Sequence, residues 1–256
     1  MMYANYHTHT YLCGHASKDT PEEYVEKAIS NGLKILGFSD HSPYIFSEEH
    51  ISPFRISLKD TEKYVCEIES LKQKYRNNIE IMLGYEMEYY PKEFEKTINF
   101  IKQYPCDYLI LGQHFTNNEY DGIYSGTVST VKTLKTYVNQ VIEGINTGVF
   151  SCVAHPDLIF YRENLDIYIE EMTKLCIEAK KHNIPFEFNL LGFDEGRAYP
   201  FSEFWKIVSQ VGNEVIIGSD AHKKERVCKL EIYNKAKRYL SEHDIVPIEK
   251  LDIKKV

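Results

Sequence analysis

The sequence lacks the features that mark secreted and membrane-spanning proteins. No basic segment followed by an apolar one opens the chain, so we expect no signal peptide. The longest apolar runs, Tyr108 to Leu111 and Val215 to Ile217, are far too short to cross a bilayer. The 6 cysteines form no CxxC pair, which favours reduced thiols and a cytoplasmic location.

Positive charge is also in short supply. The 256 residues include 30 Lys and Arg against 38 Asp and Glu, which gives a formal net charge of −8. A protein that coats nucleic acid needs clustered positive charge, so we expect no nucleic-acid partner and no membrane partner. The same balance is compatible with a small anionic ligand that is bound by a local cationic site.

Domain linkers rich in proline, glycine or serine are absent, as are internal repeats. Instead, short β-rich runs alternate with segments of helical periodicity, which is typical of parallel strands in an α/β fold. The 7 units predict one domain over residues 1–256, folded as a closed barrel, with an open doubly wound sheet as the alternative. The predicted strands are a run ending at His7, then residues 35–38, 79–84, 108–112, 152–154, 185–188 and 215–218.

Two of the helical segments have clear boundary signals. Thr20 is a predicted N-cap, Pro21 suits the first helical position, and Glu23 completes a capping box. Gly32 is expected to end this helix. A second helix is expected over residues 58–75, where apolar side chains recur at helical spacing.

Histidine is concentrated at the ends of the predicted strands. Of 10 histidines, 7 lie at or just after the carboxyl end of a strand. They are His7, His9 and His15 after the first strand, then His41, His114, His155 and His222 after the second, fourth, fifth and seventh. Glu86 follows the third strand and Asp220 the seventh. These strand ends converge on one face of a parallel barrel, so the side chains should meet in one pocket.

The chemistry of this set indicates metal binding. A single histidine is usually a half-buried ring with ordinary hydrogen bonds, but strand ends carry most of the histidines here. Imidazole and carboxylate suit a borderline first-row cation, and paired cysteines for a structural zinc site are lacking. In the His-x-His of His7 and His9, both rings point to the same face of a strand. The 9 candidate ligands exceed the needs of one ion, which predicts two or three ions with Glu86 as the bridge.

Six ordered motifs resemble those of the PHP (polymerase and histidinol phosphatase) superfamily, and within it the histidinol-phosphatase branch. The resemblance extends over nearly the whole chain and implies a distorted (β/α)7 barrel with a trinuclear metal centre. The motifs are H-T-H-T at 7–10, S-D-H at 39–41, G-Y-E at 84–86, G-Q-H-F at 112–115, A-H-P-D at 154–157 and G-S-D-A-H at 218–222.

The resemblance implies ligand sets for two or three divalent ions, with zinc, manganese and iron as the candidates. The sets are His7, His9, Glu86 and Asp220; His15, His41 and His222; and Glu86, His114 and His155. Asp40 is expected to orient His41, the ligand that it precedes. Gln113 departs from the small residue usual in the family, which affects the pocket near the third ion.

This chemistry suits hydrolysis of phosphate monoesters, with in-line attack by a metal-bridging hydroxide. Asp220 or His222 is the candidate for carrying the leaving-group proton. The resemblance favours Arg162 and Arg197 as phosphate contacts, whereas we expect Arg55 to be a solvated surface residue.

The branch of the family implies L-histidinol phosphate, an intermediate of histidine biosynthesis, as the substrate. The alternatives are another small phosphoester, a phosphotyrosyl protein or a nucleotide end, and, in a different class, a metal-dependent binding module without turnover. For the amine of histidinol phosphate the loops offer Glu119, Asp121, Asp194 and Glu195, and for its imidazole Phe115 and Tyr161.

Overall fold

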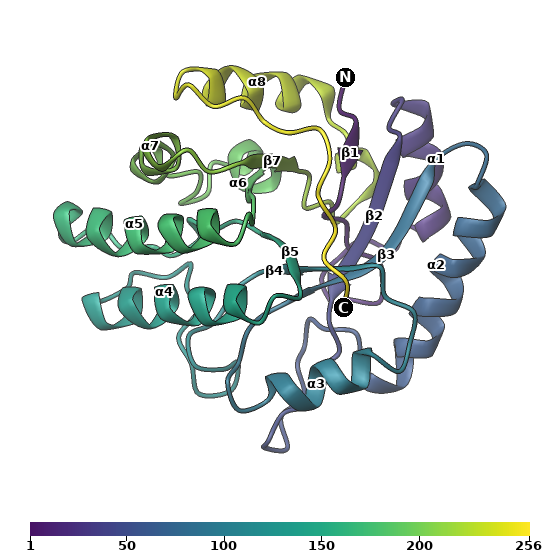
Figure 1. Ribbon diagram of the computed structural model, residues 1–256. Helices are drawn as coiled ribbons and strands as arrows, with labels where there is room; N and C mark the ends of the chain where they lie inside the picture. The colour runs from purple at the N-terminus through teal and green to yellow at the C-terminus, as the bar shows by residue number, and fades with distance from the viewer.

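The computed structural model describes residues 1–256, and Figure 1 shows its strands at the centre with the helices around them. Each of the seven strands pairs in parallel with the next strand in sequence. The strands are β1 (Ala4–Asn5), β2 (Ile35–His41), β3 (Glu80–Met87), β4 (Tyr108–Leu111), β5 (Phe150–Val153), β6 (Phe186–Asn189) and β7 (Val215–Gly218). This confirms the predicted strand order.

The last strand returns to the first, so the sheet forms a nearly closed barrel. Just beyond the two strands, Thr8 and Ala221 form a parallel bridge. The backbone N–H of His9 donates to the carbonyl of Ala221 at 2.9 Å, and the N–H of Ala221 donates to the carbonyl of His7 at 3.1 Å. The barrel is therefore the correct one of the two predicted arrangements, and the open sheet is not formed.

Helices connect successive strands and cover the outside of the barrel (Figure 1). None of them is long and apolar enough to cross a membrane. The α-helices are α1 (Pro21–Ser30), α2 (Thr61–Tyr75), α3 (Phe94–Ile101), α4 (Val131–Asn146), α5 (Leu165–Lys181), α6 (Leu190–Glu195), α7 (Ser202–Val211) and α8 (Leu230–Ser241). Two short 3-10 helices, η1 (Leu58–Asp60) and η2 (Lys224–Arg226), precede α2 and α8.

The boundary signals of α1 are confirmed. The Thr20 side chain accepts from the Glu23 N–H, and the Glu23 side chain accepts from the Thr20 N–H. Pro21 is the first residue of the helix. Gly32 follows the C-cap with φ +81°, a conformation that glycine adopts without strain.

Several predicted boundaries were wrong, among them the end of β3, which continues to Met87 beyond the predicted residue 84. Residues 58–75 are not one helix, because Ser57 accepts from the Asp60 N–H and closes a 3-10 turn ahead of α2. β2 also runs on to His41, beyond the predicted end at 38. Its polar last residues stay in register with β3, with His41 opposite Glu86. The apolar run from which the strand was predicted therefore stops where the buried polar residues of the site begin.

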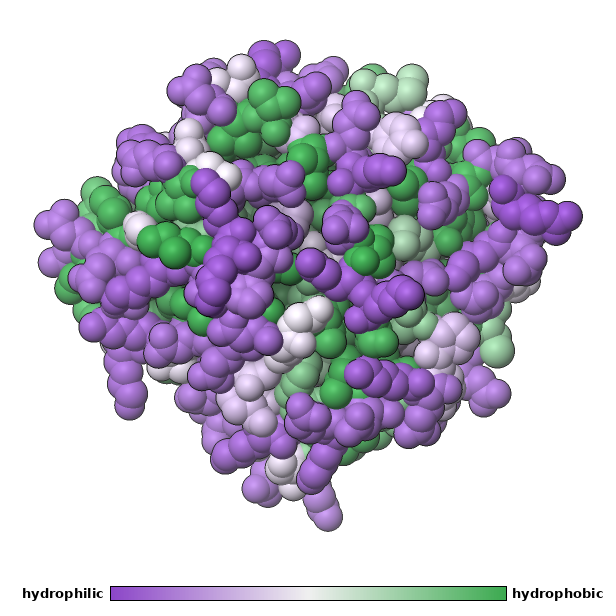
Figure 2. Space-filling model, in the orientation of Figure 1, coloured by the Kyte–Doolittle hydropathy of each residue, from purple (hydrophilic) through white to green (hydrophobic).

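The core has an outer and an inner part. The larger cluster packs between the helices and the sheet, and a smaller one, which includes Tyr6, Tyr108 and Ile216, lies among the strands. Leu251 of the C-terminal segment joins this inner cluster, and Ile248 forms a bridge with Ile216. Figure 1 shows that segment in yellow, crossing in front of the strands, and Figure 2 shows the largely hydrophilic surface on the same side.

Asp157 of the A-H-P-D motif anchors α7 to the barrel. Its Oδ2 accepts from Trp205 Nε1 at 3.0 Å and from the Phe201 N–H at 2.6 Å. Burial raises the pKa of Asp157 to about 6, although both donors act to lower it. Asp157 therefore stabilises the packing of α7 against the barrel, in addition to following His155 in the motif.

We expect Asp157→Ala to lower the free energy of unfolding by about 2–4 kcal/mol, because it leaves two buried N–H groups without an acceptor. Denaturant unfolding monitored by circular dichroism measures this. Asp252→Ala, at an exposed carboxylate, is the control and should stay within about 0.5 kcal/mol of wild type. Equal unfolding midpoints for the two variants would contradict the assigned role of Asp157.

Candidate metal centre

The strand-end side chains meet at a cavity of about 600 Å³. All of the predicted ligands except His7 line it, and the ring of His7 lies within 5.7 Å of that of His155, centre to centre. The remaining lining includes Phe54, Phe115, Tyr124, Glu195, Arg197, Tyr199 and Arg226. Residues far apart in sequence are thus brought together, as predicted for the strand ends of a parallel barrel.

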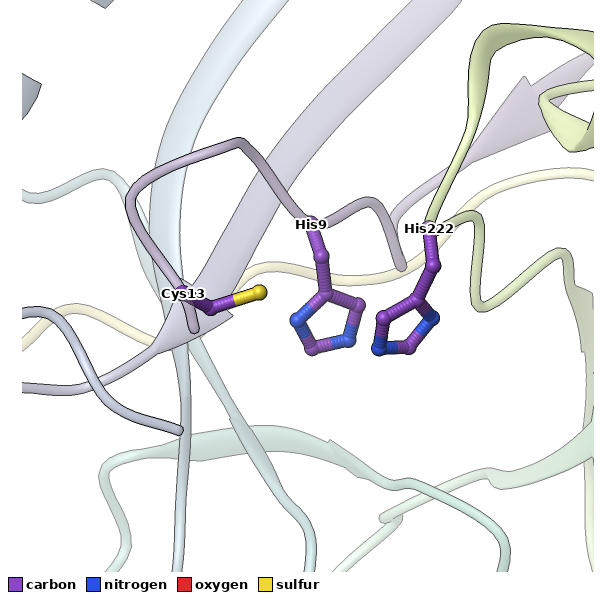
Figure 3. Close-up of side chains that lie close together, drawn as sticks. All are labelled: His9, Cys13 and His222. Carbon is purple, nitrogen blue, oxygen red and sulfur yellow. The ribbon is translucent and has the colours of Figure 1, made fainter. Parts of the chain in front are cut away.

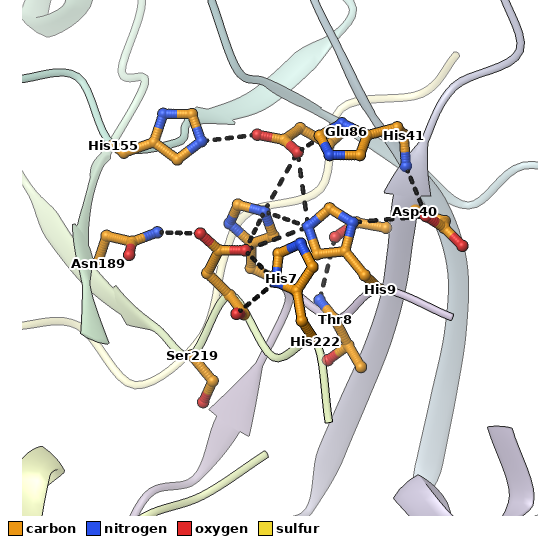
Figure 4. A network of polar contacts seen from close by, with 12 residues as sticks. His7, Thr8, His9, Asp40, His41, Glu86, His155, Asn189, Ser219 and His222 are labelled. Atoms are coloured by element: carbon orange, nitrogen blue, oxygen red, sulfur yellow. Dashed lines mark hydrogen bonds and ion pairs between the residues drawn. The ribbon is translucent and has the colours of Figure 1, made fainter. Parts of the chain in front are cut away.

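His7, His9, Glu86 and Asp220 form the most buried group. Nε2 of His9 lies 3.1 Å from Nε2 of His7 and 3.2 Å from Asp220 Oδ1. Glu86 Oε2 is 3.5 Å from Nε2 of His7 and 3.6 Å from that of His9. Figure 4 shows the side chains of His7, His9 and Glu86 pointing toward one another. Four potential ligand atoms therefore converge on one small volume.

The second predicted set lies beside the first. The ligand atoms of His15, His41 and His222 are within 4.8 Å of one another. Nε2 of His222 is 2.8 Å from Nε2 of His15. The ring of His222 stacks on that of His9 with centroids 4.0 Å apart, which links the two groups.

Glu86 divides its oxygens between histidines on two sides. Oε2 lies 3.1 Å from Nδ1 of His41, whereas Oε1 lies 2.8 Å from Nε2 of His155 and 3.6 Å from Nε2 of His114. The ligand atoms of His41, Glu86 and His114 also form a compact group. A carboxylate with its two oxygens used in this way has the arrangement of a bridging ligand.

Several buried polar atoms of the cluster have no hydrogen-bond partner. They include Nδ1 of His41, Oε2 of Glu86 and Oδ1 of Asp220. Orphaned buried polar atoms of this kind are costly unless an ion or another ligand satisfies them. The donor set, neutral nitrogen with carboxylate oxygen, fits zinc, manganese or iron.

The carboxylates of the cluster are held in the charged form. Burial acts to raise the pKa of Glu86 and Asp220, but the neighbouring histidines bring both well below their ordinary values. For His222, burial and the nearby His9 lower the pKa to about 3, so its imidazole is neutral near pH 7. For His7 and His9, burial acts to lower the pKa, but the neighbouring carboxylates raise it well above the ordinary value, so an ion that binds at these rings must displace their protons.

Glu187 is a residue that the sequence analysis missed. Its Oε1 lies 2.8 Å from Nδ1 of His7, and its Oε2 accepts from the N–H of His155 at 3.1 Å. A carboxylate at Nδ1 orients the ring so that Nε2 faces the cluster. The isolated acid within the apolar run P-F-E-F-N-L was the available signal.

Asp40 lies behind the cluster, but the ring that its carboxylate approaches is that of His9, and it bonds only the backbone of His41, the ligand that it was expected to orient. Its Oδ1 accepts from the N–H of His41 at 2.9 Å and is also 3.4 Å from Nδ1 of His9. Cys13 is on the same side of His9, and Figure 3 shows its sulfur pointing at that ring with His222 beyond. Burial raises the pKa of the Cys13 thiol, so the thiol remains protonated.

Two of the predicted ligands have strained backbones. His155 has φ +30° and Asp220 has φ +48°, both in the left-handed region that favours glycine. Such conformations cost about 1–3 kcal/mol each and are kept where the surrounding structure enforces them. At His155 and Asp220 the strain coincides with side chains directed into the cluster.

Of the two arginines expected to contact phosphate, one lies at the cavity and the other does not. Arg197 lines the cavity, held by Glu195 at 2.7 Å. Arg162 does not line it, because its guanidinium donates to the carbonyls of Tyr161 and Ala198 and covers the Phe201 ring. That placement gives no support to the phosphate contact predicted for Arg162.

Arg226, which the analysis overlooked, lines the same wall, and its Nη2 lies 2.9 Å from Glu195 Oε1. The expectation that Arg55 is solvated was wrong, since its side chain is 2% exposed. Two carboxylates, Glu88 and Glu119, neutralise it.

Of the residues suggested as contacts for the substrate's amine and imidazole, only some line the cavity. Phe115 and Glu195 line the cavity. Tyr161 is buried elsewhere, and Glu119 is paired with Arg55. Gln113 is buried and joins two loops, because it accepts from the Tyr89 N–H at 3.0 Å and donates to the Phe115 carbonyl at 2.7 Å.

Comparison with known proteins agrees with this architecture. A PHP domain model matches residues 5–191. A probable histidinol-phosphatase of Deinococcus radiodurans is 28% identical over 86% of each chain. The histidinol-phosphatase of Bacillus subtilis is 26% identical over 84% of this chain and 92% of its own. The crystal structure of histidinol phosphate phosphatase from Lactococcus lactis, complexed with zinc, L-histidinol and phosphate, superposes with a TM-score of 0.75 at 18% identity over 98% of each chain.

We expect Gly112→Ala to reduce metal content, because a Cβ there would overlap with the Glu86 carboxylate. Elemental analysis of protein purified without chelator should show the loss of at least one ion per chain relative to wild type. Gly148→Ala is the matched control: its φ of +75° makes alanine unfavourable, but no atom lies within 4 Å. A Gly112→Ala variant with full metal content would contradict the close packing assigned to Glu86.

Proposed function

The chain belongs to the PHP domain family, and from that membership we propose that it is a metal-dependent phosphatase that hydrolyses L-histidinol phosphate to L-histidinol and phosphate. The reaction is a step of histidine biosynthesis, and we assign it to the cytoplasm. The observation that carries the proposal is the cavity itself, which is lined both by a cluster of buried imidazoles and carboxylates and by two arginines. A phosphate ester is the substrate class that needs both.

Divalent ions bound at the cluster would supply Lewis acidity, which lowers the pKa of water and neutralises phosphoryl charge. The chain's own residues provide the remaining functions. Arg197 and Arg226, which line the same cavity, would present guanidinium donors to the phosphoryl oxygens. Glu195 holds both of them, with 2.7 Å to Arg197 and 2.9 Å to Arg226. Tyr199 accepts a further hydrogen bond from Arg197 at 3.3 Å.

We assign relay of the leaving-group proton to Asp220 and His222. Both are unprotonated near pH 7, so they would first accept the proton released by the attacking water and then pass it to the leaving alkoxide. The His222 side chain is 18% exposed, against 6% for Asp220, so His222 is the more accessible from the cavity. Its Nδ1 is 3.1 Å from the Asp220 carbonyl oxygen and 3.3 Å from Oδ1, and its Nε2 faces His15 as a ligand atom.

The identity of the leaving group is supported by the aromatic side of the cavity. Phe54 and Phe115 line it with ring planes 17° apart and centroids 6.2 Å apart. Tyr124 lies next to Phe115, with centroids 5.5 Å apart. Flat aromatic faces of this kind suit an imidazole ring. The histidinol-phosphatases among the relatives point to the same substrate.

A substrate panel on metal-analysed protein tests the assignment. We expect kcat/KM for L-histidinol phosphate to exceed that for p-nitrophenyl phosphate and for a mononucleotide at least a hundredfold, about 2.7 kcal/mol. If a nucleotide or a phosphotyrosyl peptide is preferred, the phosphatase assignment stands and the histidinol assignment fails. If metal-loaded protein hydrolyses none of the four, the chain is a binding module.

We expect Arg197→Ala to reduce kcat/KM for histidinol phosphate at least tenfold, about 1.4 kcal/mol of transition-state stabilisation. Metal content should be unchanged, because Arg197 contacts Glu195 and Tyr199 rather than the cluster. Arg238→Ala, at an exposed arginine of α8, is the control. Wild-type kinetics in the Arg197→Ala variant would remove this residue from the phosphate site.

A further inference from the structure

Arg55 is a buried arginine that lies two contacts behind the histidine cluster. It belongs to the loop between β2 and η1, and 2% of its side chain is exposed. Its Nη2 lies 2.7 Å from Glu88 Oε2, and its Nε donates to Glu119 Oε2 at 2.6 Å. Arginine is rarely this buried unless its charge is paired. Two carboxylates at one guanidinium therefore point to a specific role for the charge.

Each of these carboxylates in turn contacts a histidine. Glu88 Oε1 lies 2.8 Å from Nδ1 of His114, and Glu119 Oε1 lies 2.9 Å from Nε2 of His50. The polar contacts thus run without a break from His50, 23% exposed, to His114 at the cavity. Nε2 of His114 is 3.6 Å from Glu86 Oε1. The line of contacts ends at the bridging carboxylate.

Glu88 selects one tautomer of His114. As the ion-pair partner of an arginine, its carboxylate can only accept hydrogen bonds, so Nδ1 of His114 carries the proton. The lone pair on Nε2 is then directed to the side of Glu86, as a metal ligand requires. Glu88 is completely buried, and a buried carboxylate without a cation is strongly unfavourable. Arg55 supplies that cation.

The same guanidinium supports the aromatic wall of the cavity. Its central carbon lies 4.9 Å from the Phe54 ring centre and 5.1 Å from that of Tyr44. Phe54 lines the cavity edge-on to His41, with centroids 5.0 Å apart. Tyr44 donates its hydroxyl proton to the Glu88 carbonyl at 3.0 Å. Arg55 thus connects the β2–η1 loop to both the histidine cluster and the cavity wall.

We propose that Arg55 is a positioning residue: through Glu88 it fixes the ring of His114 for binding of one divalent ion. The inference rests on the proposed function in one respect, that the histidine cluster is a metal centre. It assigns to Arg55 no contact with substrate. Its consequence is that one ion of the centre depends on a loop that carries none of the nine candidate ligands.

The test measures ion binding rather than turnover. Metal-depleted full-length protein is titrated with Zn²⁺ against a chromophoric chelator, and in parallel with Mn²⁺ by equilibrium dialysis. We expect Arg55→Gln to weaken one ion at least tenfold and to leave the others within threefold, which matches the usual effect of removing an outer contact of a ligand. Arg76→Gln, at an exposed arginine after α2, is the matched control and should bind as wild type.

A double-mutant cycle shows whether Arg55 acts through Glu88. If it does, Arg55→Gln combined with Glu88→Gln should weaken the ion no more than Glu88→Gln alone. Additive losses would overturn the proposed route. Thermal unfolding of the metal-free proteins, run alongside, separates a merely structural role, which would lower the midpoint without changing the ion affinities.

Arg55→Lys keeps the proposal testable should Arg55→Gln not fold. Lysine retains the charge, but a single ammonium replaces the fork that reaches both carboxylates. We expect a threefold to tenfold loss at the same ion, again without further loss when Glu88→Gln is added. Wild-type affinity in every folded Arg55 variant overturns this proposal alone. A wild-type chain that binds no ion overturns the proposed function as well.

Discussion

The burial of one carboxylate, that of Glu86, sets the conditions for the whole polar site. It is 1% exposed, and a carboxylate is stable at that depth only beside positive charge. Histidines from several strand ends surround it, and either protons or divalent ions on those rings can supply the charge. Protons and ions compete for the same nitrogen atoms, so metal binding and the protonation of the cluster are linked.

Keeping such a cluster together imposes costs on the surrounding backbone. Gly112 has no side chain because a Cβ would overlap with Glu86, and Gly218 has none because of Glu187. His155 and Asp220 adopt left-handed conformations that residues with side chains avoid. Behind the ligands, further carboxylates hold individual rings, as Glu187 does for His7. The apolar core around the barrel stabilises a fold that can carry these local penalties.

The two parts of the cavity lining differ in origin. The histidine cluster comes from residues at or just beyond the strand ends, whose positions follow from the parallel pairing of the sheet. The rest of the lining comes largely from connecting segments: Phe54 precedes η1, Glu195 ends α6, and Arg226 ends η2. The barrel therefore fixes where an ion can bind, whereas the loops fix what can lie beside it.

Local patterns in the sequence determined the strand order, the capping of α1 and the group of strand-end histidines and acids at the cavity, because strand periodicity and helix caps depend on neighbouring residues. Strand-end histidines could be grouped without coordinates, since parallel strands bring their carboxyl ends together. The residues that contact the ligands from behind could not be grouped in this way. Glu187 meets His7 across 180 positions, and Arg55 meets Glu119 across 64. From sequence alone, a charged residue is predicted to be exposed to solvent. Only the tertiary structure shows the oppositely charged partner that allows it to be buried.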